Sequence, residues 1–361
     1  MSKKAIIAMS GGVDSSVAAY IMKTKGYECI GATMKLFDNE DTGISKEHSC
    51  CSLEDVEDAK NVAGILDIPH YVFNFSDKFK ECVIDKFISD YEHGRTPNPC
   101  IECNRHLKFQ KLFQRVKELD FDYVVTGHYA RIEYDNNLGR YLLKKAADDT
   151  KDQGYVLYSL TQEQLAHTLF PLGDMKKSEV REIAQKMNFI NAKKHDSQDI
   201  CFVQNGKYAE FIENYTGKKY PAGNFVDKNG NVMGRHKGII RYTIGQRKGL
   251  GLALPKPAYV CAIDTEKNEV ILGDNEDLFT TTLIADNINL ISVESIEKPM
   301  RCKAKVRYSQ KEEDATVTQL DDNRIKIEFD KPQRAVTCGQ AAVLYDNDII
   351  VGGGTINKIL K

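Results

Sequence analysis

Short apolar runs alternate with helical patterns along the first part of the chain. The apolar runs predict strands at residues 5–9, 29–36, 70–75 and 123–126. Between them, apolar positions at three- and four-residue spacing predict helices at 15–25, 53–66, 77–91 and 104–119. Strands that alternate with helices are typical of βαβ units, in which a parallel sheet binds ligands at the carboxyl ends of its strands.

The pattern changes further along the chain. A helix is predicted at 178–187, where Ser178 is in position to cap it. From about Gly217, short β-like runs are separated by glycines and turn pairs, which predicts small β domains. We therefore expect an α/β domain at 1–210, a central domain at 211–282 and a C-terminal domain at 283–361.

Glycines and serines join the first predicted strand to the first predicted helix in the stretch Ser10-Gly11-Gly12-Val13-Asp14-Ser15-Ser16. Gly11 and Gly12 let the backbone approach a phosphate closely, and the helix N-terminus behind them presents N–H groups to it. Asp14 adds a carboxylate that is placed to cap the helix or to bind magnesium. The stretch matches neither the Walker motif nor the dinucleotide fingerprint. It predicts a phosphate-binding loop of another kind, and an ordinary strand-to-helix turn is the alternative.

Composition is that of a soluble globular protein. The 361 residues are 28% charged and 42% hydrophobic, and no apolar run approaches the roughly 20 residues of a membrane span. Met1-Ser2-Lys3-Lys4 leads into a predicted strand without the plan of a signal peptide. We therefore expect a cytoplasmic protein of two or three domains with no membrane segment.

Basic residues are segregated in the central part of the chain. The formal net charge is −2, yet residues 228–263 contain no Asp or Glu. The cations of this stretch are Lys228, Arg235, Lys237, Arg241, Arg247, Lys248 and Lys256. Such segregation predicts an anionic partner larger than a nucleotide, with a solvated basic loop as the alternative.

Three of the ten cysteines stand in polar settings. Cys100 and Cys103 form a Cys-x-x-Cys at the head of a predicted helix, with Cys103 or Asn104 near its N-cap, and Cys201 follows Asp199 in a polar loop. A helix dipole favours the thiolate form there. The residues alone leave three interpretations open: a redox pair, a zinc site short of one ligand, or a nucleophile that works with a persulfide carrier. Five others, Cys29, Cys82, Cys261, Cys302 and Cys338, are expected to be core residues, and Cys50-Cys51 part of a loop.

Several motifs together resemble one family. Ser-Gly-Gly-x-Asp-Ser at 10–15 is similar to the pyrophosphate loop of the N-type ATP pyrophosphatases. With Pro97-Asn98-Pro99, Cys103-Asn104, 126–130, 151–153, 199–202 and 338–340, the chain resembles the tRNA-specific 2-thiouridylases (MnmA family) over essentially its whole length. The resemblance implies an adenine-nucleotide hydrolase-like catalytic domain, a small basic central domain for tRNA and a C-terminal β-barrel.

The resemblance also implies roles for individual residues. Cys103 would be the nucleophilic cysteine and Cys201 the carrier of persulfide sulfur. ATP would lie against Ala8, Met9, Ser10, Gly11, Gly12, Val13, Asp14, Ser15, Met34 and Gly127. The target uridine would meet Asn98, Pro99 and Cys100, and further tRNA contacts would come from His128, Lys151, Asp152, Gln153, Arg307, Tyr308 and Gln340.

The implied activity is that of a tRNA-uridine 2-sulfurtransferase acting on the wobble uridine, position 34. ATP and Mg²⁺ would activate the uracil C2 oxygen as an adenylate, and sulfur would displace AMP. A cysteine desulfurase or a sulfur-relay protein would supply the sulfur. Two other functions remain as alternatives: an amidating ligase that uses the same loop, and a non-catalytic sensor of metal and nucleotide.

Cys100 departs from the pattern of better-known members, which have Asp at this position. Together with Cys103 and Cys201 it offers three thiolates, enough to ligate a four-iron, four-sulfur (4Fe-4S) cluster with one open iron. Two mechanisms are therefore compatible with these cysteines. One is a persulfide relay through Cys201 and Cys103, and the other uses sulfide bound to a cluster that the same thiols hold. The third thiol favours the cluster for this chain.

Overall fold

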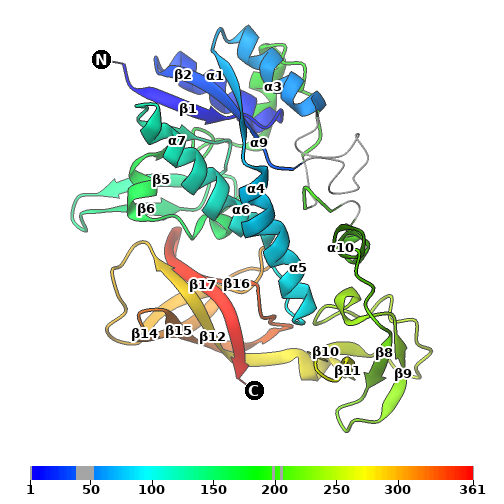
Figure 1. The fold of residues 1–361 in the computed structure, drawn as a ribbon. Coiled ribbons are helices and arrows are strands. Elements are labelled where there is room, and N and C mark those ends of the chain that lie inside the picture. Colours follow the sequence, from blue (N-terminus) through cyan, green and yellow to red (C-terminus); the bar gives the residue numbers. More distant parts are fainter. Residues whose placement is uncertain (1, 38–52, 197–199, 204–205, 361) are drawn as a thin grey trace. The chain divides into compact units, whose positions relative to one another are not determined.

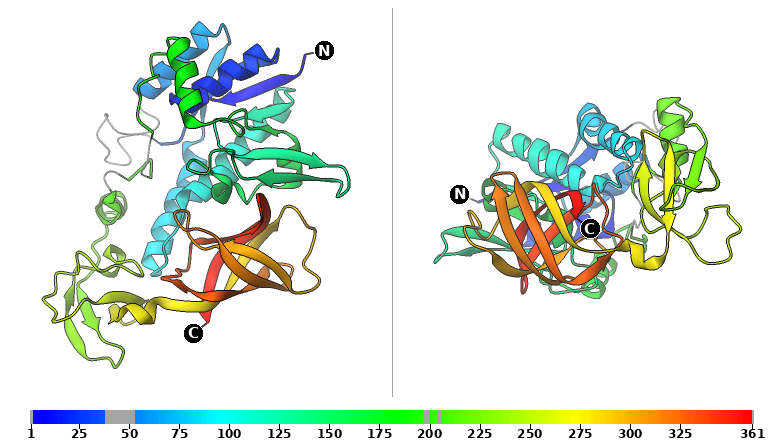
Figure 2. Two further views of the ribbon diagram at one scale, coloured as in Figure 1. Left: turned by 180° about the vertical axis from the view of Figure 1, so that it is seen from behind. Right: turned by 90° about the horizontal axis from the view of Figure 1, so that it is seen from below.

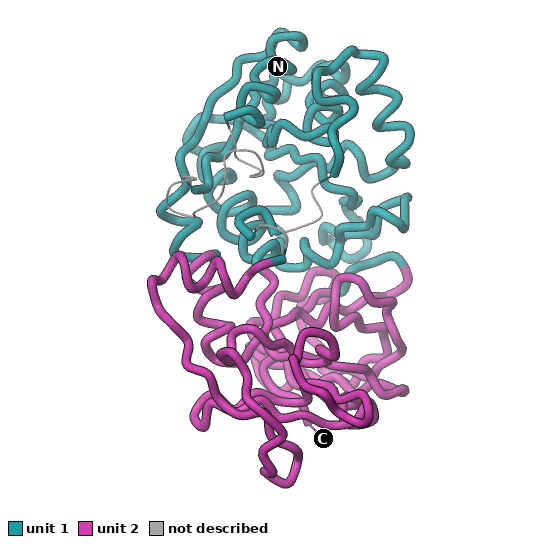
Figure 3. The backbone as a smooth tube through the Cα atoms, turned by 90° about the vertical axis from the view of Figure 1, so that its right-hand side faces the viewer, with its two compact units in different colours: residues 1–83, 99–206, 348–351 teal, residues 84–98, 207–347, 352–361 magenta. Residues whose placement is uncertain are grey.

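The computed structural model describes residues 2–37, 53–196, 200–203 and 206–360. The chain divides into two compact units (Figure 3). Unit 1 is Met1–Val83, Pro99–Gly206 and Asp348–Val351, and unit 2 is Ile84–Asn98, Lys207–Asn347 and Gly352–Lys361. Within the ranges that the structure describes, no helix is long and apolar enough to cross a membrane.

Unit 1 contains the parallel sheet that the sequence predicts. Its order is β3-β2-β1-β4-β7, and all four pairings are parallel. The strands are β1 (Lys4–Ala8), β2 (Glu28–Lys35), β3 (His70–Asn74), β4 (Tyr123–Val125) and β7 (Thr168–Leu169). The strand order reverses between β1 and β4, and open α/β sheets bind ligands at such a switch point. The glycine loop follows β1 directly, at this point.

Helices with apolar faces cover this sheet (Figure 1). α1 (Val13–Thr24), α3 (Leu53–Ile65) and α9 (Lys177–Lys186) share a core with β1 that includes Ile7, Val17, Val62 and Val180. α9 starts at Lys177 with Lys176 as its N-cap residue, so the prediction that Ser178 caps this helix was wrong. The Asp148 carboxylate accepts the Lys177 N–H at 3.1 Å and satisfies part of the helix N-terminus.

The two predicted helices at 77–91 and 104–119 are built from several turns of different pitch. The first consists of α4 (Ser76–Phe79), the π-helix η1 (Lys80–Ile84) and α5 (Asp85–Glu92). The second consists of α6 (Pro99–Cys103), the π-helix η2 (Asn104–Lys111) and α7 (Leu112–Glu118). It begins at Pro99, earlier than predicted, because proline fits the first helical position, where its missing N–H is not needed. π-Helical turns are frequent at functional sites.

A hairpin and short helices complete unit 1. The strands β5 (Arg131–Asp135) and β6 (Arg140–Lys144) pair with each other, and β6 also pairs with Ile349 and Ile350. The 3₁₀ helix η3 (Gly154–Leu157) contacts α6 and η2. α8 (Gln162–Ala166) begins with a capping box formed by Thr161 and Gln164.

The first part of unit 2 is a four-stranded sheet with the order β10-β11-β8-β9. Its strands are β8 (Gly223–Val226), β9 (Val232–His236), β10 (Tyr259–Asp264) and β11 (Glu269–Gly273). Its core contains Phe225, Tyr242, Val260, Val270 and Leu272. α10 (Tyr208–Thr216) precedes the sheet, the 3₁₀ turn η5 (Ile239–Arg241) lies between β9 and β10, and the 3₁₀ turn η6 (Asn275–Leu278) follows β11.

The C-terminal strands of unit 2 form a closed barrel (Figure 2). The order β12-β15-β14-β13-β16-β17 closes because β12 also pairs with β17. The strands are β12 (Phe279–Leu290), β13 (Met300–Lys305), β14 (Glu313–Asp321), β15 (Arg324–Arg334), β16 (Ala341–Asp346) and β17 (Ile349–Leu360). Ile325, Ile327 and Phe329 alternate inward along β15, as a barrel strand requires. The predicted C-terminal β-barrel is confirmed.

Candidate active site

The glycine loop between β1 and α1 is shaped by close backbone packing. Gly11 has a φ of +74°, and a Cβ at this position would lie 2.3 Å from the backbone oxygen of Asp55. Gly12 is the N-cap residue of α1 in an extended conformation and has no side chain with which to cap the helix. The first N–H groups of α1 therefore have no acceptor within the helix. Such an exposed helix start, next to a glycine turn, is suited to binding phosphate.

Hydroxyl groups of the loop stabilise its conformation. Ser15 and Ser16 each donate to the Gly12 carbonyl at 3.0 Å, and the Ser10 N–H donates to Ser15 Oγ at 3.2 Å. Ser15 and Ser16 are buried, whereas Ser10 is exposed. The Asn191 amide also donates to the Gly11 carbonyl at 2.9 Å. Of the predicted serine donors, Ser10 is thus the most accessible to a ligand.

Residues predicted to contact ATP meet at the carboxyl ends of three adjacent strands. Ala8 ends β1 and Met9 follows it, Met34 lies half-buried near the end of the neighbouring β2, and Gly127 lies just beyond β4. A Cβ on Gly127 would lie 2.7 Å from the carbonyl carbon of Asp14. The strand order therefore brings together residues more than a hundred positions apart in sequence, and only glycine fits at position 127.

Lys177 pairs with the carboxylate of the glycine loop. Its Nζ atom lies 2.7 Å from Asp14 Oδ1 and 2.8 Å from Asp14 Oδ2. Tyr129 donates its hydroxyl to Asp14 Oδ1 at 2.9 Å, and burial together with the Asp14 charge raises the pKa of Tyr129. The Lys177 side chain is only 11% exposed. Asp14 thus already has a cation and a hydroxyl donor as partners.

The Asp196 carboxylate belongs to the same network. It lies 2.8 Å from both Lys177 and Lys151 and 3.0 Å from Arg181. Burial opposes ionisation of Asp196, but hydrogen bonds from Lys151 and Lys177 outweigh it and lower its pKa to about 2. The carboxylate is therefore charged at neutral pH. The network joins the glycine loop, the predicted tRNA-contacting Lys151 and the segment that leads to Cys201.

The Cys-x-x-Cys lies in α6, at the head of the helix that continues as η2. Cys100 is exposed and Cys103 is half-buried. Glu102 lies 3.3 Å from His106, and the buried Asn104 donates to the Val156 carbonyl at 3.0 Å. Cys103 is the N-cap residue of η2, but its own backbone is helical because the helix already begins at Pro99. The predicted base-contacting residues differ in access, since Asn98 is half-buried and Pro99 is buried.

Cys201 is placed by the aromatic residue that follows it. Phe202 is buried and packs edge-to-face against Phe79 of α4, with ring centroids 5.6 Å apart. α4 in turn contacts η2, the helix that continues from Cys103. Residues 197–199 of the predicted motif lie outside the described residues. In the part of the chain that is described, no group of three or more His, Cys, Asp or Glu side chains could hold a metal ion.

His128 is buried between polar and aromatic neighbours. Its Nδ1 lies 2.7 Å from Thr126 Oγ1 and its Nε2 lies 3.5 Å from Lys108 Nζ. Burial, and then the Lys108 charge, hold the pKa of His128 well below its usual value. The imidazole is therefore neutral at pH 7. A direct contact with tRNA stays a prediction, and it requires that this side chain become exposed.

Most of the other predicted tRNA-contacting residues form hydrogen bonds with other residues of the protein. Asp152 accepts the N–H groups of Ala146 and Gly154 at 3.0 and 3.3 Å, and Gln153 accepts the N–H of Tyr129 at 3.0 Å. In unit 2, Arg307 donates to the carbonyls of Ala335 and Ile244 and, at 2.9 Å, to Thr337 Oγ1. Gln340 donates to the carbonyls of Thr96 and Pro97. Tyr308 is exposed.

The acid-free segment of unit 2 is neutralised in part by acids outside it. Lys228 pairs with Asp277, Lys256 with Asp274 and Arg241 with Glu213. Arg247 and Lys248 are exposed and have no acidic partner among the residues that the structure describes. Arg235 and Lys237 are exposed as well and have no ion pair among the described residues, so these four cations are the ones most available to an anionic partner.

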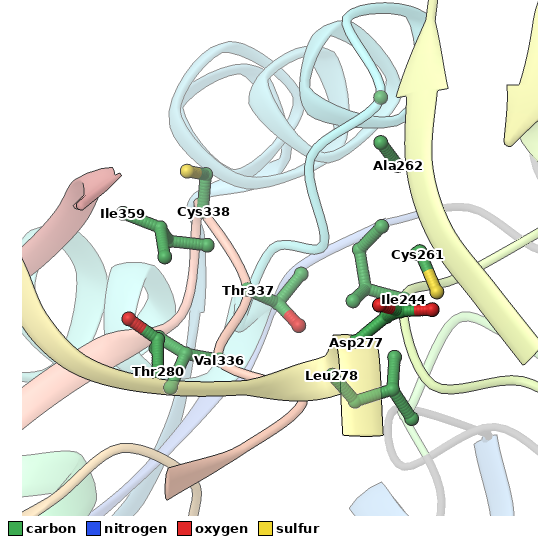
Figure 4. Close-up of a pocket in the computed structure, with 11 residues that line it drawn as sticks. Ile244, Cys261, Ala262, Asp277, Leu278, Thr280, Val336, Thr337, Cys338 and Ile359 are labelled. Atoms are coloured by element: carbon green, nitrogen blue, oxygen red, sulfur yellow. The ribbon is translucent and has the colours of Figure 1, made fainter. Parts of the chain in front are cut away.

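A small pocket in unit 2 contains two further thiols (Figure 4). It has a volume of about 160 Å³ and is lined by residues that include Cys261, Asp277, Thr337 and Cys338. The Cys338 thiol donates to the Asn357 carbonyl at 3.1 Å, and burial raises its pKa. Burial also raises the pKa of Cys29 to about 11 and of Cys302 to about 12. The thiols of Cys29, Cys302 and Cys338 are therefore protonated at neutral pH and are poor nucleophiles.

Sequence reasoning missed Lys177, Asn191 and the role of Asp196. One local signal points to Lys177: it stands in the first turn of α9 beside Lys176, where the helix dipole disfavours cations. Asn191 and Asp196 carry no such signal, because their partners lie far away in the chain.

Comparison with known proteins covers the whole chain. The family model of the tRNA methyl transferase HUP domain matches residues 3–205, that of the PRC-barrel domain 209–274, and that of the aminomethyltransferase beta-barrel domain 280–356. A protein of Clostridioides difficile named tRNA-specific 2-thiouridylase MnmA is 54% identical over 360 residues, covering 100% of this chain and 99% of its own. Proteins of the same name from Lachnoclostridium phytofermentans and Clostridium beijerinckii are 54% and 50% identical, covering 99% and 100% of this chain and all of their own lengths.

Proposed function

The chain belongs to the MnmA family of tRNA-specific 2-thiouridylases, and we propose that it is a tRNA-uridine 2-sulfurtransferase that converts the wobble uridine of tRNA to 2-thiouridine with ATP. The observation that carries this proposal is the identity of 50–54% over essentially full length with relatives of that name. The glycine loop at the sheet's switch point and the cysteines of α6 supply the two kinds of chemistry that the reaction needs.

ATP activates the uridine in the first step. The uracil C2 oxygen attacks the α-phosphorus, a C2–O–AMP adenylate forms, and pyrophosphate leaves. The loop from Ala8 to Ser15 holds the phosphates, with the N–H groups at the start of α1 directed at the negative charge. The close packing of Gly127 on Asp14 supports a nucleotide position between the ends of β1 and β4.

Magnesium stays a prediction. Asp14 is the carboxylate of the loop, but Lys177 Nζ lies within 2.8 Å of both of its oxygens. The residues present in this conformation therefore do not fit a magnesium ion at Asp14. A magnesium ion would be held mainly by the phosphates of the nucleotide itself, as is usual for this cation.

Sulfur replaces AMP in the second step. The terminal sulfur of a persulfide on Cys201 attacks C2, and AMP leaves. The Cys103 thiolate then attacks the inner sulfur on Cys201, so that the S–S bond to the transferred sulfur breaks and 2-thiouridine is released. The resulting Cys103–Cys201 disulfide is reduced by an external thiol before a cysteine desulfurase or a sulfur-relay protein loads the next sulfur. Phe202 packs against Phe79 of α4, and α4 contacts η2, which follows Cys103; these contacts support the pairing.

A 4Fe-4S cluster does not fit the described arrangement. Cys100, Cys103 and Cys201 are described, and they do not form a group that could hold a metal ion. We therefore propose the persulfide relay and keep the cluster, which the third thiol favoured, as the alternative that an iron and sulfide assay tests. Cys100 is exposed on α6, next to Asn98 and Pro99, and all three stay predicted contacts of the target uridine.

The partner is tRNA, whose wobble base lies in a single-stranded loop and is readily extruded into a site. Because the proposed substrate is tRNA, we also propose that the protein is located in the cytoplasm. An amidating ligase and a non-catalytic sensor both lack support from the full-length relatives.

Mass spectrometry of tRNA nucleosides tests the proposal. The purified protein is incubated with tRNA, ATP, a thiol reductant and a cysteine desulfurase with cysteine. We expect 2-thiouridine at the wobble position and equal amounts of AMP and pyrophosphate. If pyrophosphate forms without tRNA but with an amine acceptor, the protein is a ligase. If ATP is never turned over, it is a sensor.

A further inference from the structure

The ammonium group of Lys177 occupies an unusual position beside the glycine loop. It is almost buried, and it lies 2.7–2.8 Å from both oxygens of Asp14 and 2.8 Å from Asp196. Its backbone is fixed as the first residue of α9, since Asp148 accepts its N–H. None of the predicted ATP or tRNA contacts includes this residue.

We propose that Lys177 binds the β- and γ-phosphates of ATP and then the departing pyrophosphate, with Asp14 and Asp196 holding the ammonium group beside the loop until the nucleotide arrives. This inference rests on the proposed function, because that function places ATP at the loop. Lys177 would be a catalytic residue of the adenylation step, since it contacts the leaving group.

Charge balance in the loop supports the assignment. Asp14 stands in the first turn of α1, where a polyphosphate would meet the N–H groups of the helix. An unneutralised carboxylate there would repel the phosphates, and Lys177 removes that repulsion. Its network has three cations, Lys151, Lys177 and Arg181, for three carboxylates, Asp14, Asp148 and Asp196, so the carboxylates beside the loop are balanced by cations.

The network also lets Lys177 change partners at low energetic cost. An ammonium group has three donors, and here they face two oxygens of Asp14 and one of Asp196. When Lys177 turns one donor from Asp196 to a phosphate, Asp196 keeps Lys151 at 2.8 Å and Arg181 at 3.0 Å. No carboxylate is then left without a cation. The alternative is that Lys177 is only a structural link between α1 and the segment before Cys201.

Equilibrium binding without tRNA or a sulfur donor separates the two roles. The affinities of Mg-ATP, pyrophosphate and AMP are measured by calorimetry for the wild type, Lys177→Met and Lys177→Arg. Because a charge-assisted hydrogen bond contributes roughly 1.5–3 kcal/mol, we expect Lys177→Met to weaken Mg-ATP and pyrophosphate binding about 10- to 100-fold and AMP binding less than about threefold. Lys177→Arg should recover a large part of the loss.

Lys194→Met is the matched control. Lys194 also bridges two carboxylates, Asp55 at 2.6 Å and Asp58 at 2.8 Å. Its loss should lower thermal stability as a structural link does and leave the ratio of Mg-ATP to AMP affinity unchanged. The inference is overturned if Lys177→Met binds Mg-ATP like the wild type, or if Mg-ATP and AMP affinities fall equally. Because these assays need no thiolation, they stand or fall separately from the test of the proposed function.

Discussion

The side-chain amide of Gln340 donates to the carbonyl of Thr96 at 2.9 Å and to that of Pro97 at 3.1 Å, across 244 residues of sequence. The Thr96 N–H donates in turn to the Cys338 carbonyl at 2.9 Å. The loop before β16 thereby holds the residues that lead to Asn98. Gln340 is thus a positioning residue of the segment before the Cys-x-x-Cys.

We expect Gln340→Ala to lower the free energy of unfolding by about 1–3 kcal/mol, because two partly buried carbonyls lose a donor. The rate of thiolation should fall while the affinity for tRNA changes little. Gln319→Ala removes a comparable pair of bonds, to Ile296 and Asp321, elsewhere in the barrel. Gln319→Ala should lower the free energy of unfolding without slowing thiolation. A loss of tRNA affinity in Gln340→Ala without a loss of stability would instead indicate a direct tRNA contact.

Cys103→Ser and Cys201→Ser should each reduce thiolation by more than about a hundredfold, because each removes a sulfur that forms or breaks a bond. Cys302→Ser is the control, since its buried thiol has a pKa raised to about 12 and takes no part in the reaction. Both active-site variants should still bind ATP. Equal activity of Cys103→Ser and the wild type would contradict the relay.

Cys100→Asp tests the cluster against the relay. If the relay operates, this variant should keep thiolation within a few-fold, and anaerobically purified wild type should be active without iron or acid-labile sulfide. Iron and sulfide assays of the active fraction provide the measurement. Activity that follows iron content, and that Cys100→Asp abolishes, would support the cluster.

Gly11→Ala should weaken both folding and ATP binding. A left-handed φ alone costs an alanine about 1–2 kcal/mol. Gly26→Ala measures the cost of the left-handed φ without a clash, because Gly26 also has a positive φ of +82° but nothing within 4 Å of an added Cβ. Gly11→Ala should lose more, since its Cβ would lie 2.3 Å from the backbone oxygen of Asp55. Equal unfolding free energies of the two variants would disprove the clash.

Stability should fall at acid pH through His128. Its pKa in the folded state lies well below the usual 6.5, so below that pH the unfolded chain binds a proton that the folded chain does not. The free energy of unfolding should fall with decreasing pH by up to about 1.4 kcal/mol per pH unit for this group. His128→Gln should remove that part of the slope in urea titrations. An NMR titration that finds the His128 ring protonated near pH 6.5 would refute the prediction.

Exposed cations of the central sheet should govern the salt dependence of tRNA binding. Arg247→Ala combined with Lys248→Ala should reduce the slope of log K against log salt by about 1.4–1.8, if each side chain contacts one phosphate. Lys228→Ala combined with Lys256→Ala is the control, because these lysines pair with Asp277 and Asp274. The control should change the slope less. An unchanged slope in the variant with Arg247→Ala and Lys248→Ala would place the tRNA elsewhere.

The sequence predicted the local elements well where neighbouring residues decide the structure. The strands at β1 to β4 were recognisable from apolar runs, and the loop at Gly11 from its glycines, because side-chain pattern and φ are set over a few residues. The start of α6 at Pro99 was missed, because a second proline and Cys100 looked like an approach to the helix. Caps are decided by a single hydrogen bond, as the wrong prediction at Ser178 illustrates.

By itself, the sequence determined the parallel sheet, the phosphate-type loop from Ser10 to Ser16 and the presence of three polar cysteines, since these follow from local periodicity and residue type. Only the tertiary structure decided that Lys177 pairs with Asp14, 163 residues away, and that Gln340 holds Thr96. Ion pairs and long-range hydrogen bonds depend on which strand ends the sheet order brings together. That order is set by packing over the whole domain, and no short window of residues contains it.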